Sequence, residues 1–149
     1  MRVRRATVED IPVITRLAGQ LGGVTDADAL PTRLRRILDH AHHAVFIAEC
    51  DMSDDGLASE PCGFVAAEHR LLLQWGELIE LIALVVDDAS RRQGIGTQLV
   101  AAVEAWAARR GVSRVRVRSS LARDASHAFY PALGYQLEKT QHCYLRSLA

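Results

Sequence analysis

The chain has little of what marks a secreted, membrane-spanning or nucleic-acid-binding protein. Its three cysteines follow no metal-ligand spacing, and no apolar run reaches the length that crosses a membrane. The N-terminus, Met1-Arg2-Val3-Arg4-Arg5, lacks the apolar region of a signal peptide. The 18 basic residues are matched by 18 acidic ones, so no excess of positive charge favours a nucleic acid or a membrane surface as partner. We therefore expect a cytoplasmic protein that binds neither.

The cysteines also bear on the redox state of the protein. Cys50 and Cys62 flank a predicted hairpin and are expected to lie near each other, whereas Cys143 follows much later in the chain. Intracellular thiols are normally kept reduced, so we expect a pair of free thiols here rather than a disulfide.

Length and composition are those of one globular domain. A chain of 149 residues buries a substantial core, and 49% apolar with 24% charged residues is ordinary for a globular protein. No internal repeat or linker divides the sequence. We expect a single domain over residues 1–149.

The most informative stretch is Arg91-Arg92-Gln93-Gly94-Ile95-Gly96. It follows an apolar run, Leu78 to Val86, that is typical of a buried strand, and it opens a helical pattern from Ile95 to Arg110. Glycine permits positive φ and close approach of a ligand to the backbone, and the first amides of a helix attract an anion. The two arginines add permanent positive charge. The turn therefore predicts a phosphate-binding site.

Taken alone, this turn is a weak signal, because a glycine turn with solvated arginines has the same sequence. Its position between a strand and a helix gives it weight. The phosphate loop of nucleoside triphosphatases is absent, since the lysine-threonine pair of this chain, Lys139-Thr140, lies far downstream. Position 99 holds Leu where a dinucleotide fingerprint requires glycine. A nucleotide-phosphate binder stays open as an alternative and predicts affinity for ATP or NAD.

The remaining segments predict a mixed sheet covered on both faces. We expect strands over residues 3–5, 44–50, 62–73, 78–86, 112–119 and 136–148, and helices over residues 7–21, 28–38, 95–110 and 124–133. Strands joined by short connections pair antiparallel, whereas the strand-helix-strand unit over residues 78–119 requires a parallel, right-handed crossover.

Two groups of side chains have no assigned role. Three arginines, Arg114, Arg116 and Arg118, share one face of a predicted strand. A solvated or dimer-facing surface is the simplest interpretation of this face, and anion binding is the alternative. His40, His42 and His43 follow the second helix, but no carboxylate or thiol completes a metal site at suitable spacing, so we expect solvated histidines and no metal.

The strand, the R-x-x-G-x-G turn, the helix and the segment His127-Ala-Phe-Tyr130-Pro-Ala-Leu-Gly134-Tyr135 together resemble the GNAT superfamily of N-acetyltransferases. The specific motifs lie within about Glu80 to Tyr135, and the order of elements agrees over most of the chain. The resemblance implies an α/β (α+β) fold with a mixed, mostly antiparallel sheet of six to seven strands, about four flanking helices and splayed central strands. It also implies acetyl-CoA as the cosubstrate.

The resemblance assigns the cofactor-binding residues by position. In the family the amides of the turn hold the pyrophosphate, and the pantetheine arm pairs with the main chain of the central strand. Relatives often carry asparagine near the start of the last helix, where this chain has Arg123, with Ser126 as a nearby substitute. The implied acetyl-CoA site comprises Leu84, Val85, Val86, Arg91, Arg92, Gln93, Gly94, Ile95, Gly96, Thr97, Arg123 and Ser126.

Two residues are candidates for proton transfer. An alkyl amine with a pKa of about 10.4 is neutral only to roughly one part in a thousand at pH 7, so acetyl transfer to an amine favours a positioned base. The resemblance points to Glu80, with Glu77 and Glu68 in reserve; a carboxylate that is hydrated or paired with an arginine is the structural alternative. It also points to Tyr130 as the acid that protonates the leaving thiolate, against a core tyrosine with a satisfied hydroxyl.

The favoured hypothesis is an N-acetyltransferase in which a primary amine attacks acetyl-CoA directly, because no serine or cysteine occupies a nucleophile elbow. A non-catalytic acyl-CoA-binding or regulatory domain of the same fold is the alternative. The acceptor is expected to be a small-molecule or peptide amine, which the sequence does not specify further. The family is often homodimeric.

Overall fold

The computed structural model describes every residue except 92 and 120–123 and the side chain of residue 124. Arg92 and Arg123, both predicted to bind the cosubstrate, lie outside the described residues. The chain forms two compact units, Met1–Arg118 and Ser119–Ala149, and each is described by itself.

The first unit is built on a five-stranded sheet in the order β1-β2-β3-β4-β5. The strands are β1 (Arg2–Arg5), β2 (His43–Asp51), β3 (Ser59–Leu72), β4 (Gly76–Val86) and β5 (Val115–Val117). Neighbours from β1 to β4 pair antiparallel, whereas β5 pairs parallel with β4. The predicted antiparallel pairings and the predicted parallel crossover are both confirmed.

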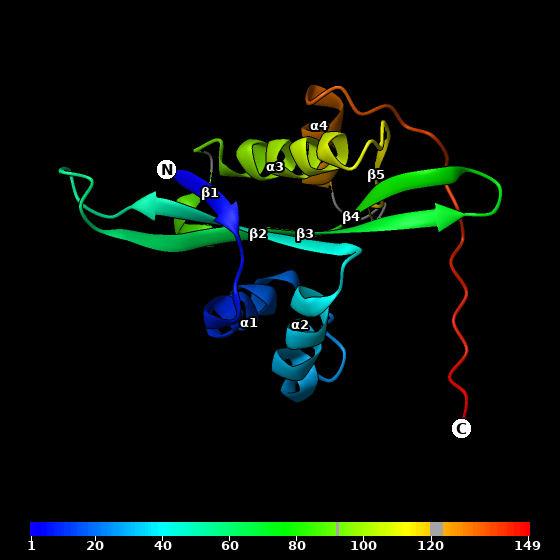
Figure 1. Cartoon of the computed structure of the whole chain (residues 1–149), viewed down its shortest axis with the longest axis horizontal. Coiled ribbons are helices and arrows are strands. Elements are labelled where there is room, and N and C mark those ends of the chain that lie inside the picture. Colours follow the sequence, from blue (N-terminus) through cyan, green and yellow to red (C-terminus); the bar gives the residue numbers. More distant parts are fainter. Residues whose placement is uncertain (92, 120–123) are drawn as a thin grey trace. The chain divides into compact units, whose positions relative to one another are not determined.

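Helices cover both faces of this sheet. Figure 1 shows α1 (Ile11–Ala18) and α2 (Leu30–Asp39) on one face and α3 (Ile95–Arg109) on the other. Short 3-10 turns flank these helices at Val8–Asp10 (η1), Gly19–Leu21 (η2), Ala27–Ala29 (η3) and Asp88–Ser90 (η4). The helix cover confirms the predicted layered architecture.

The core has one layer on each face, because successive residues of a strand point to opposite sides. Toward α1 and α2 the core includes Ile14, Leu17, Val45, Ile47 and Phe64. Toward α3, the predicted apolar stripe of that helix is buried in full: Ile95, Leu99, Val100, Val103, Trp106 and Ala107. Each fully buried aliphatic side chain of this kind contributes roughly 1.5–3 kcal/mol. The two layers hold β4, and the turn that follows it, in a rigid frame.

At Gly63 the backbone of β3 lies close to the backbone of β4 and to a side chain of α3. A Cβ atom at this position would lie 2.8 Å from the carbonyl oxygen of Val85 and 3.3 Å from the side chain of Leu99. Glycine is therefore required here by space, and it lets α3 approach the sheet directly beside the end of β4.

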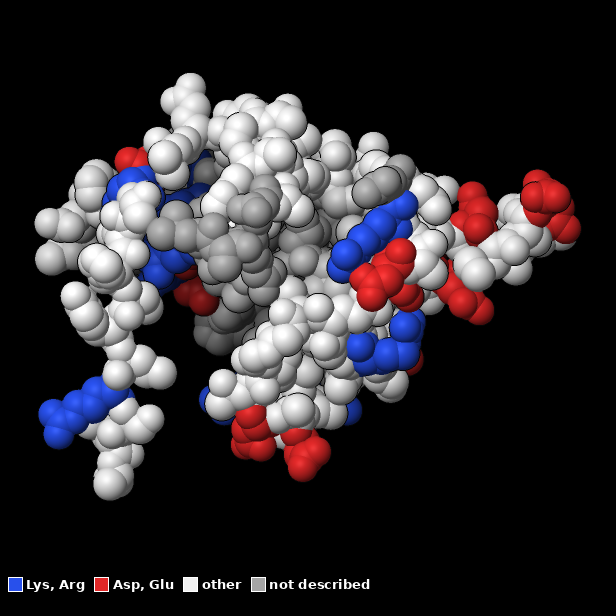
Figure 2. All heavy atoms as spheres, turned by 180° about the vertical axis from the view of Figure 1, so that it is seen from behind, with Lys and Arg blue, Asp and Glu red and all other residues white. Residues whose placement is uncertain are grey.

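Basic and acidic side chains are interspersed over the surface. In Figure 2 lysine and arginine atoms (blue) occur at the left of the view and again right of centre, with aspartate and glutamate atoms (red) beside them. Arg70 and the three arginines of the β5 segment belong to the part of the sheet where β3, β4 and β5 pair. Asp26 and Asp28 before α2 and Asp54 in the β2–β3 loop are exposed carboxylates.

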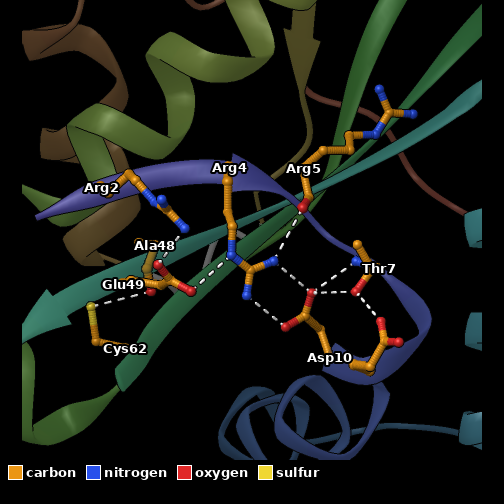
Figure 3. A network of polar contacts seen from close by, with 9 residues as sticks. Arg2, Arg4, Arg5, Thr7, Asp10, Ala48, Glu49 and Cys62 are labelled. Carbon is orange, nitrogen blue, oxygen red and sulfur yellow. Dashed lines mark hydrogen bonds and ion pairs between the residues drawn. The ribbon is translucent and has the colours of Figure 1, made fainter. Parts of the chain in front are cut away.

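A polar network fastens β1 to the start of α1 (Figure 3). The guanidinium of Arg4 donates two hydrogen bonds of 2.8 Å to the carboxylate of Asp10 and a third of 2.8 Å to Glu49. The backbone N–H of Thr7 donates to Asp10 at 2.8 Å. Asp10 is only 6% exposed, so this carboxylate is a buried anchor between the first strand and the first helix.

The expectation of free thiols is wrong for one pair, because Cys50 and Cys62 form a disulfide. The two Cα atoms are 5.9 Å apart, within the range that a disulfide spans. The pairing of β2 with β3 brings them together, with a register shift between Ala48 and Glu49 just before Cys50. The spacing of Cys50 and Cys62 in the sequence does not indicate this register shift. Cys143, by contrast, is an exposed free thiol.

The second unit contains α4 (Asp124–Ala132) and a C-terminal segment without regular structure. The strand predicted over residues 136–148 is wrong: all of these residues are exposed and none is in a strand. A strand needs hydrogen bonds to a neighbour, and none of the described strands pairs with this segment. The described sheet therefore has five strands rather than six to seven, whereas the α/β class and the four α-helices agree with prediction.

No helix in the described parts of the chain is both long and apolar enough to cross a membrane.

Candidate active site

The turn between β4 and α3 has the geometry of an anion cradle. Gly94 adopts a left-handed conformation with φ of 75° and lies at the N-cap of α3, as predicted for a glycine turn. The first bond of the helix runs from Gln98 N–H to Gly94 C=O at 3.2 Å, so the amides of Ile95, Gly96 and Thr97 precede the helical ladder. No atom lies within 4 Å of the place that a Cβ of Gly94 would take, so this side of the turn is open. The residues present therefore fit a diphosphate.

The segment leading into the turn is held by polar contacts. The backbone N–H of Ala89 donates to the carboxylate of Asp87, and this bond is the main reason that the pKa of Asp87 lies below its ordinary value. Asp87 also accepts hydrogen bonds of 3.4 Å from Arg16 and Gln20. The guanidinium of Arg91 lies 2.7 Å from Asp88 and is mostly exposed, which leaves it accessible to an anion. Gln93 is exposed as well.

The end of β4 has a free edge next to this turn. Among the described residues, β5 pairs with β4 at three positions, all in the N-terminal half of β4. Asp87 N–H donates to Cys62 C=O at 2.8 Å, and hydrogen-bonded pairs alternate along an antiparallel ladder. Leu84 and Val86 therefore direct their main-chain groups away from β3, whereas Val85 directs its groups toward β3. The free edge agrees with the predicted splaying of the central strands.

Glu80 lies earlier on β4 and is surrounded by guanidinium groups. It is only 6% exposed. Its Oε2 accepts a 2.9 Å hydrogen bond from Arg70, and its Oε1 accepts bonds of 3.1 and 3.2 Å from Arg116. The Nε of Arg118 lies 3.1 Å from the same Oε1. A carboxylate offers about four acceptor positions, and the described residues leave one direction at Oε2 open for a further donor.

Strand register explains this cluster and accounts for the three arginines that the sequence left unassigned. Glu80 is the partner of Arg116 in the parallel pairing of β4 with β5 and of Glu68 in the antiparallel pairing with β3. Side chains of paired residues share a face, so Arg114, Arg116 and Arg118 lie on the face of Glu80, and Arg116 and Arg118 contact it. Arg114 instead donates to the backbone carbonyl of Trp75. The sequence signal for this cluster was the alternation of arginine with valine over residues 114–118, together with a glutamate, Glu80, in the strand predicted to pair with it.

The reserve acids are paired too. Glu68 lies 3.7 Å from His43 and 3.4 Å from Arg70, and Glu77 lies 3.3 Å from His69. Glu77 is more exposed than Glu80 and belongs to the opposite face of the sheet by strand alternation. Neither reserve acid is as enclosed as Glu80.

The histidines after α2 lie close to one another and to His69, and His40 and His42 are exposed, as predicted. The rings of His40 and His43 are 4.8 Å apart, and those of His42 and His69 are 5.5 Å apart. Arg110 donates a 2.8 Å hydrogen bond to Nδ1 of His69, and burial lowers the pKa of His43. Within the described residues, no three or more histidine, cysteine or carboxylate side chains are arranged so that they could hold a metal ion.

Tyr130 belongs to the second unit, where it is half-buried on α4. Its ring centroid lies 5.0 Å from that of Phe129 and 5.8 Å from that of Tyr135. The backbone N–H of Tyr135 donates to the carbonyl of Tyr130 at 3.1 Å, next to Gly134 with φ of 94°. Ser126 is half-buried on the same helix. The predicted site residues thus divide between the turn and β4 in the first unit and α4 in the second.

Comparison with known proteins identifies relatives of this architecture. Residues 16–135 match the model of the Acetyltransferase (GNAT) family. A solved structure of AAC(6')-Iy, in complex with a bisubstrate analogue of CoA and acetylneamine, shares 26% identity with a TM-score of 0.84, covering 99% of this chain and 98% of that chain. The aminoglycoside 6'-N-acetyltransferase AAC(6')-Ih from Acinetobacter baumannii shares 20% identity with a TM-score of 0.83, covering 99% of each chain. The corresponding enzyme AAC(6')-IG from Acinetobacter haemolyticus shares 20% identity with a TM-score of 0.82 over the full length of both chains. A search of curated protein sequences gave no match.

Proposed function

Because this chain belongs to the GNAT family of acetyltransferases, which use acetyl-CoA, we propose that it transfers the acetyl group of acetyl-CoA to a primary amine. The observation that carries the proposal is the open turn at Gly94 directly beside the free edge of β4. The turn at Gly94 would bind the diphosphate of coenzyme A, and the neighbouring edge of β4 would bind its peptide-like pantetheine arm.

The chain's own groups suit the binding of coenzyme A in this manner. The amides of Ile95, Gly96 and Thr97 would donate to the phosphate oxygens, with the helix dipole and Arg91 adding positive potential. The outward main-chain groups of Leu84 and Val86 would pair with the amides of the pantetheine arm. Bound there, acetyl-CoA supplies a thioester that an amine attacks directly.

Glu80 is the proposed base, acting on the acceptor ammonium directly or through a water. In support of this role, it is a buried carboxylate on β4 with one acceptor direction open. Three arginines already bind the carboxylate oxygens and would compete with the acceptor ammonium for them. Proton transfer through a bridging water therefore fits this site better than direct binding of the ammonium by Glu80. Positioned bases of this kind contribute about 10²–10⁴-fold to the rate.

Tyr130 is the proposed acid for the leaving thiolate. The proposal rests on the family's segment around this residue and on the pKa values of a phenol and a thiol, about 10 and 8.5, which make proton transfer between them reasonable. Ordered aromatic neighbours fix the ring within the second unit.

The test begins with the titration of coenzyme A by calorimetry, followed by measurement of thiol release from acetyl-CoA with a panel of amines. The proposal expects binding and amine-dependent release. Binding without release by any amine would favour a non-catalytic acyl-CoA-binding domain, and absence of binding would refute the cosubstrate site.

The role of Glu80 is tested by Glu80→Gln, with thermal unfolding measured alongside the rate. We expect kcat to fall by about 10²–10⁴-fold, most strongly at low pH where neutral amine is scarcest. A loss of rate that only follows the loss of folded protein, or an unchanged pH profile, would assign Glu80 a structural role and leave Glu77, Glu68 or water as the base.

A further inference from the structure

The face of the sheet that carries Glu80 has more arginines than are needed to neutralise its carboxylates. On the face that Glu80 shares with Glu68, four guanidinium groups occur in the strands and their flanks: Arg70, Arg114, Arg116 and Arg118. Two carboxylates face them, and both are already bound to arginine. Arg114 donates to a neutral carbonyl and forms no ion pair with a described residue, so it adds positive charge to this face.

Of the three arginines that contact Glu80, Arg118 is the most accessible. Its side chain is 62% exposed, and its acidic partner among the described residues is Glu80, which Arg70 and Arg116 share. The side chain of Arg116, by contrast, is only 14% exposed and is committed to Glu80 through two nitrogen atoms. Among the guanidinium groups placed beside Glu80, Arg118 is therefore the one best able to bind a second anion.

The cluster is separate from the site proposed for the phosphates of coenzyme A. Glu80 precedes Val86 by six residues of strand, which corresponds to about 20 Å along β4. The turn at Gly94 begins beyond that end of the strand. An anion held by Arg118 and Arg70 would thus belong to the acceptor, on the face of the sheet that α1 and α2 also cover (Figure 1).

We propose that the acceptor is an amine that also carries a carboxylate, as an amino acid does, and that Arg118 with Arg70 binds this carboxylate while Glu80 serves the amine. This inference rests on the proposed acetyl transfer and specifies its substrate class. A guanidinium fork matches a carboxylate in a bidentate manner, and Glu80 lies close enough to serve an amino group of the same small molecule.

The same charges disfavour a polycationic acceptor. An aminoglycoside carries several ammonium groups, which require unpaired carboxylates, whereas both carboxylates of this face are occupied by arginine. This chain would then differ in acceptor from the aminoglycoside acetyltransferases whose fold it shares.

The test compares amino acids with their C-terminal amides, which have the same skeleton without the carboxylate, and includes an aminoglycoside. We expect kcat/KM to be at least about tenfold higher for the acids, the factor that one charge-assisted hydrogen bond provides. Arg118→Gln should remove most of this preference, and Arg118→Lys should retain part of it. The control is Arg109→Gln on the exposed end of α3, which changes the net charge equally and should leave the preference intact.

The outcomes separate this inference from the proposed function. Acetyl transfer that favours amides or the aminoglycoside, or a preference that Arg118→Gln leaves unchanged, would overturn the inference while the acetyltransferase stands. If no amine is acetylated, an N-acetyl amino acid and its amide are titrated calorimetrically in the presence of coenzyme A. Binding of the acid alone, lost in Arg118→Gln, would support the anion site, and equal or absent binding would overturn it.

Discussion

Replacement of Asp10 by asparagine should destabilise the first unit, and the loss should depend on pH. The carboxylate accepts three hydrogen bonds of 2.8 Å, two from the guanidinium of Arg4 and one from the backbone of Thr7. Asparagine keeps the size of the side chain but has one acceptor oxygen, so its amide group must face at least one donor. The buried guanidinium bonds then lose their charged partner.

The expected loss follows from the contacts. Hydrogen bonds to charged groups contribute about 1.5–3 kcal/mol each, and removal of one partner of a buried ion pair costs about 3–5 kcal/mol. The side chain of Arg4 is 28% exposed and keeps Glu49, so solvent and the second carboxylate moderate the loss. We expect the free energy of unfolding to fall by about 2–4 kcal/mol at pH 7. For a chain of this length that lowers the melting temperature by about 5–10 °C.

The pH dependence has a definite sign. The guanidinium of Arg4 is the main cause that lowers the pKa of Asp10 below its ordinary value of 3.8. A carboxyl group with a depressed folded pKa contributes stability above its unfolded pKa and loses it as the pH falls through the folded pKa. The gap between wild type and Asp10→Asn should therefore be full at pH 7 and close progressively below about pH 4.

The assay is urea unfolding followed by circular dichroism over a series from pH 7 to pH 3. The matched control is Asp54→Asn, the same chemical change at an exposed loop position, which should alter stability by less than about 0.5 kcal/mol. The reasoning fails if Asp10→Asn is as stable as wild type at pH 7, or if the difference is the same at pH 3.

Four further changes test the close contacts and the proposed site. Gly63→Ala should destabilise by about 1–3 kcal/mol in urea, because its Cβ would lie 2.8 Å from a backbone oxygen, while Gly19→Ala, with no atom within 4 Å, should not. Gly94→Ala should weaken coenzyme A binding about tenfold in calorimetry through strain at φ of 75°, whereas Gly56→Ala, with φ of 69° in the β2–β3 loop, should leave binding unchanged. Dithiothreitol should lower the stability of the wild type by about 3 kcal/mol but not that of Cys50→Ser, because the disulfide closes a 12-residue separation. Tyr130→Phe should lower kcat by about 10²–10⁴-fold with coenzyme A affinity retained; an unchanged kcat would remove Tyr130 from the mechanism.

The features predicted correctly from the sequence are those set by local patterns. The apolar stripe from Ile95 to Ala107 depends on helical periodicity alone, and every member predicted to be buried is buried. The left-handed Gly94 follows from the need for a glycine between a strand and a helix. The parallel crossover follows from the length of the strand-helix-strand unit.

The features that escaped prediction depend on contacts between distant segments. The arginines around Glu80 are explained by the register of β4 against β5, which no local pattern specifies. The Cys50–Cys62 disulfide depends on an irregularity in the pairing of β2 with β3 and was obscured by an expectation about the cellular compartment. Residues 136–148 were predicted as a strand from their position in the order of elements, but a strand forms only where another strand pairs with it.

The disulfide also changes how the protein would respond to a cut in its backbone. The loop between β2 and β3 exposes Leu57, with Cys50 on one side and Cys62 on the other. An endoprotease that nicks this loop would leave two fragments joined by sulfur, still paired as neighbouring strands. The nicked molecule would therefore retain the mass of the whole chain plus one water until a reductant separates it into two peptides.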